Sequence, residues 1–315
     1  MNRAKILITG GAGFIGSHLA ERLAQQNHQV CIVDNLSSGH RQNLASIAEH
    51  VEFIEGDIRD LSLLMKLCQD CQLVFHQAAI VSVPYSVDHP QETHDVNIQG
   101  TLNVLQAARS QKVKRVIFAC SAAVYGDDPA LPKQETMSPA PISPYGLEKI
   151  TSEYYLSVFH RLYGLETVSL RYFNVFGPRQ DPRSPYSGVI SIFVDRLLKC
   201  QAPLIFGDGE QCRDFVYVDN VVEANLLAAS VPAAAGRCYN IACGKSTTLN
   251  DLLRMLGHLA QEDIRPRYAE PRAGDIRESI ADISRARQEL GYEPRLAVEE
   301  GLGYLLEYER KLRQR

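Results

Sequence analysis

The chain has 315 residues, of which 45% are hydrophobic and 22% are charged, and its formal net charge is −4. This composition is typical of a soluble globular protein, and the length allows one large domain or two lobes. The slight negative charge gives no reason to expect a nucleic acid as partner. No segment approaches the roughly 18 apolar residues of a membrane span, so we expect no membrane partner and a cytoplasmic location.

The start of the chain carries the most informative pattern. Lys5–Thr9 is expected to form a short strand, and glycines follow at positions 10, 13 and 16, where a helical pattern begins. Gly10 permits a tight turn, Gly13 lets the backbone approach a pyrophosphate, and Gly16 lets the helix pack close to the strand. The phosphates of a dinucleotide would rest on the free N–H groups at the start of that helix.

A second strand, Val30–Val33, leads directly into an acid, Asp34. Roughly 20 residues after the glycines, a carboxylate accepts hydrogen bonds from the adenosine ribose and repels a 2′-phosphate. Strand, glycines, helix, strand and acid together predict a site for NAD rather than NADP. The alternative is a glycine turn in a βα unit that binds no ligand.

Short apolar runs alternate with amphipathic helical patterns as far as residue 172. Further strands are expected at Val51–Glu55, Leu73–His76, Val116–Cys120 and Thr167–Arg171, with helices such as Thr101–Ser110 and Ser152–Leu162 between them. Such alternation predicts an α/β fold with a Rossmann-type, doubly wound parallel sheet that binds ligands at the carboxyl ends of its strands.

The second half of the chain has a looser pattern. The strands expected there are Leu204–Phe206, Asp214–Val218 and Tyr239–Ile241. We predict an NAD-binding Rossmann domain over 1–172, to which 214–241 returns. Residues 173–213 and 242–315 would form a smaller, interleaved α/β lobe for the substrate.

A proline-rich segment and the cysteines are the two remaining features of the sequence. The proline-rich segment Pro129–Pro144 is either a surface connector or a wall of the active site. The eight cysteines lie mostly at apolar positions, which favours free buried thiols. Cys68 and Cys71 form a Cys-x-x-Cys without a second pair or suitably spaced histidines, so we expect no metal site.

Three residues carry the expected chemistry. Tyr145 and Lys149 are four residues apart at the start of a predicted helix, so their side chains share one face. Lys149, together with the charge of a nicotinamide ring, is expected to lower the pKa of the Tyr145 phenol and make it a base. Ser121 ends the fifth strand, where it either bridges a substrate hydroxyl and the phenol or caps the turn. We predict Ser121, Tyr145 and Lys149 to be catalytic.

Together these motifs resemble the extended short-chain dehydrogenase/reductase family, and within it the UDP-hexose 4-epimerases. The resemblance covers nearly the whole chain. Its marks are Thr9–Gly16, Asp34–Asn35, Gly56–Arg59, His76–Ala79, Ser121 with Val124–Gly126, Tyr145 with Lys149, Arg171–Gly177, Gly207–Gly209, Arg213–Asp219 and Arg272–Asp275.

The resemblance implies NAD as cofactor, a UDP-sugar as substrate and a set of residues for each. It assigns the cofactor to Gly10, Gly13, Phe14, Ile15, Gly16, Asp34, Asn35, Asp57, Ile58, Tyr145, Lys149 and Tyr172. It assigns the substrate to Ser121, Asn174, Phe206, Arg213, Arg272, Asp275 and Ser279. Asn174, Arg213 and Arg272 would hold the diphosphate, Phe206 the uracil and Asp275 the uridine ribose. Without the resemblance, Arg213 and Arg272 would equally be expected in surface ion pairs.

The residues after Ser121 indicate the subfamily. Similar dehydratases carry an Asp-Glu pair there and decarboxylases a Glu, whereas this chain has Ala122 and Ala123. Because alanine neither donates nor accepts a proton, reversible oxidation at C4 remains. Many resembling epimerases have a hydroxyl where Ala123 stands. The alternatives are a nucleotide-sugar 4-ketoreductase or dehydratase and, from another class, an NAD-sensing binding protein.

The resemblance also bears on the preferred sugar and on assembly. In similar epimerases a position just after Arg-x-Gly-Asp lines the wall beside the C2 substituent, and that position is Ser279 here. Its small side chain predicts that UDP-N-acetylglucosamine and its galacto epimer are accepted alongside UDP-glucose and UDP-galactose; the alternative is an exposed loop residue. The helices at Thr101–Ala108 and Ile150–Leu162 are apolar on more than one face, which predicts a homodimer.

Overall fold

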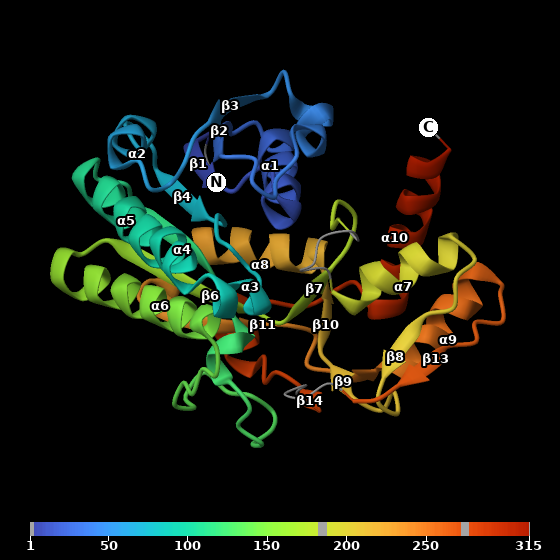
Figure 1. Cartoon of the computed structure of the whole chain (residues 1–315). Helices are drawn as coiled ribbons and strands as arrows, with labels where there is room; N and C mark the ends of the chain where they lie inside the picture. Colours follow the sequence, from blue (N-terminus) through green and yellow to red (C-terminus); the bar gives the residue numbers. More distant parts are fainter. Residues whose placement is uncertain (1–2, 182–187, 272–276, 315) are drawn as a thin grey trace.

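A seven-stranded parallel sheet forms the centre of the computed structural model, which describes residues 3–181, 188–271 and 277–314. Its strand order is β11-β6-β5-β4-β1-β2-β3 (Figure 1). The strands are β1 (Lys5–Thr9), β2 (Gln29–Asp34), β3 (Val51–Glu55), β4 (Leu73–His76), β5 (Arg115–Ser121), β6 (Glu166–Tyr172) and β11 (Arg237–Ile241). The chain winds outward from β1 in both directions, which is the Rossmann topology. The predicted fold class is confirmed.

Helices cover both faces of this sheet. The helices before residue 182 are α1 (Phe14–Gln25), α2 (Leu61–Leu67), α3 (Val83–Asp88), α4 (Pro90–His94), α5 (Gly100–Ser110) and α6 (Pro144–Tyr163). α1 packs against the later helix α8 (Val218–Ser230), whereas α5 lies between α2 and α6 (Figure 1). Because both faces are covered, the inner strands are mostly apolar; Ile6, Leu7 and Ile8 of β1 are completely buried.

The remaining elements build a second lobe around a core of its own. Its helices are α7 (Val189–Leu198), α9 (Leu249–Ala260) and α10 (Val298–Arg313), at the right of Figure 1. Its sheets are small: β7 (Asn174–Phe176) pairs with β10 (Phe215–Tyr217), β8 (Leu204–Phe206) with β13 (Arg267–Ala269), and β9 (Cys212–Arg213) with both β12 (Thr247–Thr248) and β14 (Glu278–Ser279). The buried side chains of this core include Phe193, Leu252 and Leu305.

The second half returns to the central sheet through one strand. β11 pairs in parallel with β6, where Tyr239 lies opposite Leu170. The strand expected at Asp214–Val218 exists as β10, but it does not join that sheet. It pairs with β7 instead, because the chain leaves the central sheet after β6 and the Asn174 N–H donates to the Asp214 carbonyl at 3.2 Å.

The proline-rich segment before α6 is a packed connector. The Lys133 N–H donates to the Ile280 carbonyl and the Asp282 N–H to the Lys133 carbonyl, both at 2.8 Å. The segment therefore ties the first lobe to the C-terminal region, and its residues line neither of the two clefts described below. Across the described part of the chain, no helix combines the length and the apolar character that a membrane crossing requires.

Candidate active site

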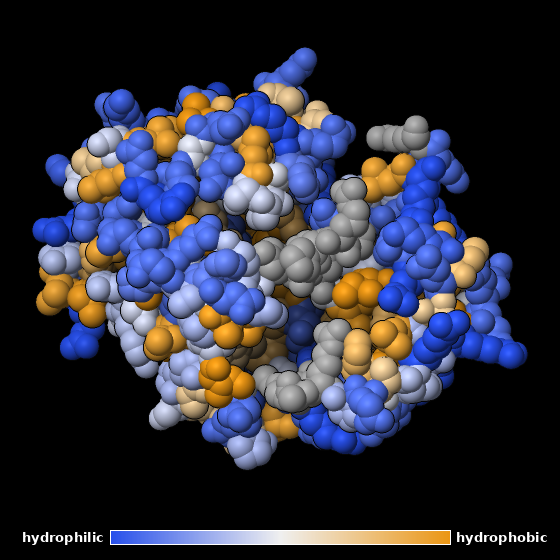
Figure 2. Space-filling model, in the orientation of Figure 1, coloured by the Kyte–Doolittle hydropathy of each residue, from blue (hydrophilic) through white to orange (hydrophobic). Residues whose placement is uncertain are grey.

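A cleft of about 520 Å³ runs along the carboxyl ends of β1, β2, β4 and β5. Figure 2 shows the surface hollowed between the two lobes, where this cleft lies. Each residue that the sequence assigned to the cofactor lines it: Gly10, Gly13, Phe14, Ile15, Gly16, Asp34, Asn35, Asp57, Ile58, Tyr145, Lys149 and Tyr172. Residues separated by up to 162 positions in the chain thus meet in one cleft.

The glycine turn brings bare backbone to the floor of this cleft. Gly10 has a φ of +70°, and a Cβ there would lie 2.6 Å from the Ala78 nitrogen, so only glycine is accommodated. Gly13 is the N-cap of α1 and no side chain caps the helix among the described residues. The first N–H groups of α1 therefore face the cleft, where they and the helix dipole suit a pyrophosphate.

Polar groups at the ends of β2 and β3 surround the expected adenosine site. The Asp34 carboxylate accepts hydrogen bonds from the Ala12 N–H at 3.0 Å and the Leu36 N–H at 2.8 Å. Burial raises the pKa of Asp34 above its usual range. Asn35 donates to Asp57 at 3.0 Å, and the Arg59 guanidinium holds the pKa of Asp57 at about 2. A dinucleotide fits this lining of glycines, uncapped helix and carboxylate.

The three predicted catalytic residues come together at the end of β5. Tyr145 is the second residue of α6, directly after Pro144, and its N–H donates to Ser86 Oγ at 3.1 Å. The Ser121 hydroxyl lies near the Tyr145 phenol and acts to lower the pKa of that phenol. The Ser121 oxygen also accepts from the Ala123 N–H at 3.1 Å, so this serine caps the turn and contacts the phenol at once.

The electrostatics of this group differ from the prediction. Burial raises the pKa of Tyr145 to about 12, although the nearby Ser121 hydroxyl opposes this shift. Lys149 does not lower it: its ammonium donates to the Ala119 carbonyl at 2.8 Å and lies 5.8 Å from the centre of the Tyr145 ring. Burial lowers the pKa of Lys149 to about 8. The expected effect of Lys149 on the phenol is therefore wrong for the protein by itself.

Two residues beside Tyr172 were missed from the sequence. Asn225 of α8 donates to the Tyr172 hydroxyl at 2.8 Å, and Gln77, which follows β4, donates to it at 3.3 Å. Burial raises the pKa of Tyr172 to about 12. The phenol is thereby fixed on the cleft wall as a neutral group. Gln77 lies within a motif of the family resemblance, whereas Asn225 has no signal in the sequence.

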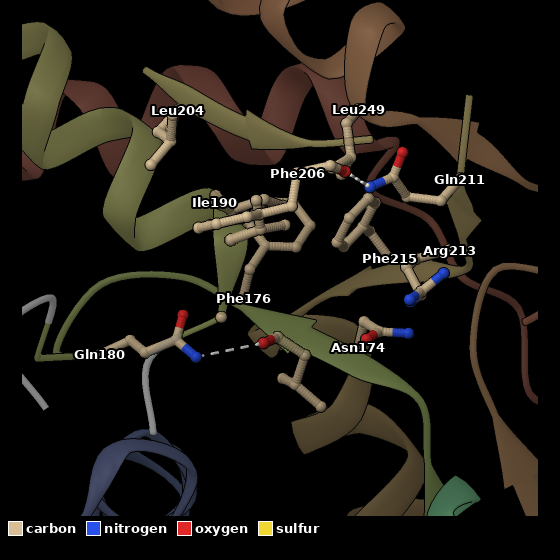
Figure 3. Close-up of a pocket in the computed structure, with 13 residues that line it drawn as sticks. Asn174, Phe176, Gln180, Ile190, Leu204, Phe206, Gln211, Arg213, Phe215 and Leu249 are labelled. Atoms are coloured by element: carbon tan, nitrogen blue, oxygen red, sulfur yellow. Dashed lines mark hydrogen bonds between the residues drawn. The ribbon is translucent and has the colours of Figure 1, made fainter. Parts of the chain in front are cut away.

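A second cleft of about 410 Å³ lies in the other lobe and contains three of the predicted substrate residues, Asn174, Phe206 and Arg213. Figure 3 shows Phe206 beside other apolar side chains, with Arg213 and Asn174 at the opposite end. Val175 and Gln180 line both clefts, so the two adjoin. The cleft is therefore apolar around Phe206 and becomes polar and basic at Asn174 and Arg213.

Gln211 was also missed, and it supports this cleft. Its Nε2 donates to the Phe206 carbonyl at 2.7 Å (Figure 3). The residue is buried, and the bond fixes the backbone of β8 where Phe206 lines the cleft. A glutamine between Gly209 and Arg213 has no distinctive spacing, so only knowledge of the fold reveals its role.

Asp214 holds three segments of the second lobe together. Its carboxylate accepts hydrogen bonds from the N–H groups of Cys243 at 2.8 Å, Gly244 at 2.9 Å and Ala281 at 3.2 Å. It is completely buried, and burial raises its pKa to about 6. Because Asp214 follows Arg213 directly, this clasp also fixes the strand that carries the arginine.

Ser279 lies beside Arg213 and lines neither of these two clefts. It belongs to β14, where it pairs in parallel with Arg213 of β9, and the Asp214 N–H donates to its carbonyl at 2.8 Å. It is thus a partly buried strand residue. Arg272 and Asp275, predicted to contact the diphosphate and the ribose, lie outside the described residues.

No cluster of potential metal ligands occurs in the parts of the chain that are described. The eight cysteines are free thiols, and Cys200 alone among them is exposed. Burial raises the pKa of Cys68 to about 12 and that of Cys71 to about 11, which keeps this Cys-x-x-Cys protonated. The pair therefore behaves as part of the apolar core.

Comparison with known proteins agrees with the site geometry. The model of the NAD dependent epimerase/dehydratase family matches residues 6–242. The chain belongs to this family. The resemblance found in the sequence is thereby confirmed, and so is NAD as the cofactor.

Individual relatives match over almost their full length. A putative UDP-glucose 4-epimerase of Methanocaldococcus jannaschii is 43% identical over 299 residues, which cover 94% of this chain and 95% of the relative. The solved UDP-N-acetylglucosamine 4-epimerase of Methanobrevibacter ruminantium M1, in complex with UDP-N-acetylmuramic acid, is 41% identical with a TM-score of 0.95, covering 99% of this chain and 100% of that one. The UDP-glucose 4-epimerase of Thermotoga maritima with UDP-glucose is 43% identical with a TM-score of 0.93, covering 98% and 99%.

Proposed function

We propose that this protein is an NAD-dependent 4-epimerase of UDP-hexoses that interconverts gluco and galacto forms through a 4-keto intermediate. The observation that carries the proposal is the meeting of Ser121, Tyr145 and Lys149 at one end of the cofactor cleft. The adjoining apolar and basic cleft has the chemistry to bind a uracil and a diphosphate. Two solved relatives named for such epimerisation share the fold over the whole chain.

Each of the three side chains has a part in moving one proton. The Tyr145 phenolate takes the proton from the C4 hydroxyl, and Ser121, which lies near the phenol, orients that hydroxyl. NAD, held by the residues that line the cofactor cleft, would supply the hydride acceptor and donor that oxidation and reduction at C4 require. The Lys149 ammonium, held by the Ala119 carbonyl, would orient the nicotinamide ribose, and the charge of the nicotinamide ring would favour the phenolate. Arg213 and Asn174 hold the diphosphate while the sugar turns, and Tyr145 finally gives its proton back.

The turn after Ser121 argues against the related eliminations. Ala122 and Ala123 begin a short 3-10 helix, and Ala123 contacts Ser121 only through its backbone N–H. Positions 122 and 123 therefore offer no side-chain acid or base for a proton at C5. A ketoreductase would convert its cofactor in every turnover, and an NAD-sensing protein would not need the Ser121–Tyr145 pair.

For the sugar, we propose that the protein accepts the N-acetylated pair together with UDP-glucose and UDP-galactose. Ser279 is the observation that favours this breadth, because it lies beside Arg213 in the strand pairing of β14 with β9. A hydroxymethyl side chain at this position leaves volume that a tyrosine would occupy. The solved relative named as a UDP-glucose 4-epimerase is 43% identical to this chain, and the one named as a UDP-N-acetylglucosamine 4-epimerase is 41% identical.

We propose further that the protein is a homodimer formed through α6. Tyr154, Val158 and Leu162, spaced along one face of this helix, are 55%, 44% and 68% exposed. Phe159 of the same helix is buried and packs in the core. Three large apolar side chains in a row on one long helix are typical of a surface that a partner covers.

Incubation with four UDP-sugars tests the activity directly. The purified protein is given UDP-glucose, UDP-galactose and their N-acetylated counterparts separately, and the C4 epimers are resolved by chromatography. We expect each sugar to yield its epimer with no change in mass and no released NADH. A product lighter by one water, or stoichiometric consumption of cofactor, would establish a dehydratase or ketoreductase instead.

A further inference from the structure

A buried carboxylate lies immediately beside the catalytic lysine. Glu148 is 4% exposed, and each of its oxygens has a partner. Thr93 Oγ1 of α4 donates to Oε1 at 2.6 Å, and Asn97 Nδ2 donates to Oε2 at 2.7 Å. Asn97 lies in the π-helix Asp95–Gln99, which joins α4 to α5. Burying an ionisable group costs free energy unless hydrogen bonds or an opposite charge compensate, so ionisable groups are rarely buried without a reason.

The hydrogen bonds of Asn97 extend from Glu148 to the cofactor cleft. Asn97 Oδ1 accepts from the Ile80 N–H at 2.8 Å, and Asn97 Nδ2 donates to the Ile80 carbonyl at 3.0 Å. Both amide hydrogens and the oxygen of the Asn97 side chain are thus hydrogen-bonded: one N–H donates to Ile80 and the other to Glu148. Since Ile80 lines the cofactor cleft, a short chain of bonds links the catalytic helix α6 to the cleft wall.

We propose that Glu148 is a positioning residue with two effects: through Asn97 it fixes the cleft wall at Ile80, and it places one negative charge beside Tyr145 and Lys149. The first effect follows from the hydrogen bonds alone. The second rests on the proposed function, because it concerns the proton that these two residues handle.

Few charges compete with Glu148 in this buried region. Among the described residues, the titratable groups that face Tyr145 and Lys149 are Cys120 of β5 and His76 of β4, besides Glu148. Burial lowers the pKa of His76 to about 3 and raises that of Cys120, so both are neutral near pH 7. The ion pair of Glu153 and Arg171 lies beyond Cys120. Glu148, next to Lys149 and three residues after Tyr145 in α6, is therefore the carboxylate that acts on both catalytic residues, and it acts to raise the pKa of each.

Two substitutions separate the two effects. In Glu148→Gln the amide oxygen can still accept from Asn97, and its NH₂ can donate to Thr93 Oγ1, whose own proton goes to the Pro90 carbonyl at 3.2 Å. This variant keeps the bonds and removes the charge. Glu148→Ala removes both the bonds and the charge. Glu49→Gln, at an exposed position outside both clefts, controls for the loss of one negative charge.

Two measurements on the NAD-loaded protein need no turnover. The ionisation of Tyr145 is followed by phenolate absorbance, as the difference between each protein and its Tyr145→Phe counterpart. Removal of a neighbouring negative charge favours the phenolate, so we expect the midpoint to fall by about one pH unit in Glu148→Gln and to stay unchanged in Glu49→Gln. The acid limb of the kcat profile should move with it. Hydrogen exchange at the Ile80 amide should accelerate about tenfold in Glu148→Ala and stay near the wild-type rate in Glu148→Gln.

Each result supports or contradicts one effect. An unshifted phenol midpoint in Glu148→Gln overturns the role of the charge, and an unchanged Ile80 exchange rate in Glu148→Ala overturns the link through Asn97. A wild-type protein that epimerises none of the four UDP-sugars would refute the proposed function and leave both of these measurements valid.

Discussion

The clasp at Asp214 predicts how firmly the second lobe is held around its cleft. Asp214→Ala would remove the acceptor of three N–H groups, of which those of Cys243 and Ala281 are buried and that of Gly244 is partly exposed. A buried donor left without a partner costs about 1–3 kcal/mol, so the loss for the two buried donors should lower the free energy of unfolding by roughly 2–6 kcal/mol. Asp214→Asn keeps one acceptor oxygen and should cost about half as much.

Urea unfolding and ligand titration check this prediction together. Because Asp214 adjoins Arg213 and its N–H donates to the Ser279 carbonyl, UDP should bind at least about tenfold more weakly to Asp214→Asn, whereas NAD should bind as before. Asp263→Ala, an exposed acid of the same lobe, is the matched control. If Asp214→Ala loses less than about 1 kcal/mol, the three hydrogen bonds do not carry the stability assigned to them.

Four further predictions concern the chemistry, the cofactor, the sugar and the assembly. Tyr145→Phe should bind NAD and UDP-sugar nearly normally and lose turnover by about 10²–10⁴-fold; residual activity above roughly a tenth would contradict its role as the base. Asp34→Ala should weaken the preference for NAD over NADP in a binding titration, and unchanged discrimination would mean that Asp34 only supports the Ala12 turn. Ser279→Tyr should abolish turnover of the N-acetylated pair and spare UDP-galactose; equal loss on both would remove Ser279 from the sugar site. Sedimentation should give a dimer at micromolar concentration, and a monomer there would refute the α6 interface.

The first half of the fold follows closely from the sequence, because each element there has a local cause. The apolar runs of β1 to β6 match the predicted strands within two residues at either end. Ser143, Pro144 and Gly164 mark the start and end of α6 as cap, first turn and left-handed C-cap. The glycines before α1 predict the cofactor cleft, since their chemistry depends only on neighbouring residues.

What the sequence did not reveal depends on contacts between distant segments. The placement of β10 beside β7 follows from tertiary pairing, which a three-residue apolar run cannot specify. The pKa of Tyr145 is raised because burial outweighs its polar neighbours, and burial becomes known only from the fold. Asn225 and Gln211 lie 53 and 5 residues from their partners Tyr172 and Phe206, and no spacing rule links them.

The short pairing of β9 with β14 has a consequence for altering this protein. β14 has two residues and pairs with β9 at the edge of a three-stranded sheet that is separate from the seven-stranded one. A side-chain replacement at Ser279 keeps the backbone bond to Asp214, so the proposed role of this position in sugar preference can be tested without disturbing that bond. On the proposed role of Ser279, a library of variants in this strand should change the sugar preference and keep the wild-type melting temperature. Such variants leave Ser121, Tyr145 and Lys149 unchanged.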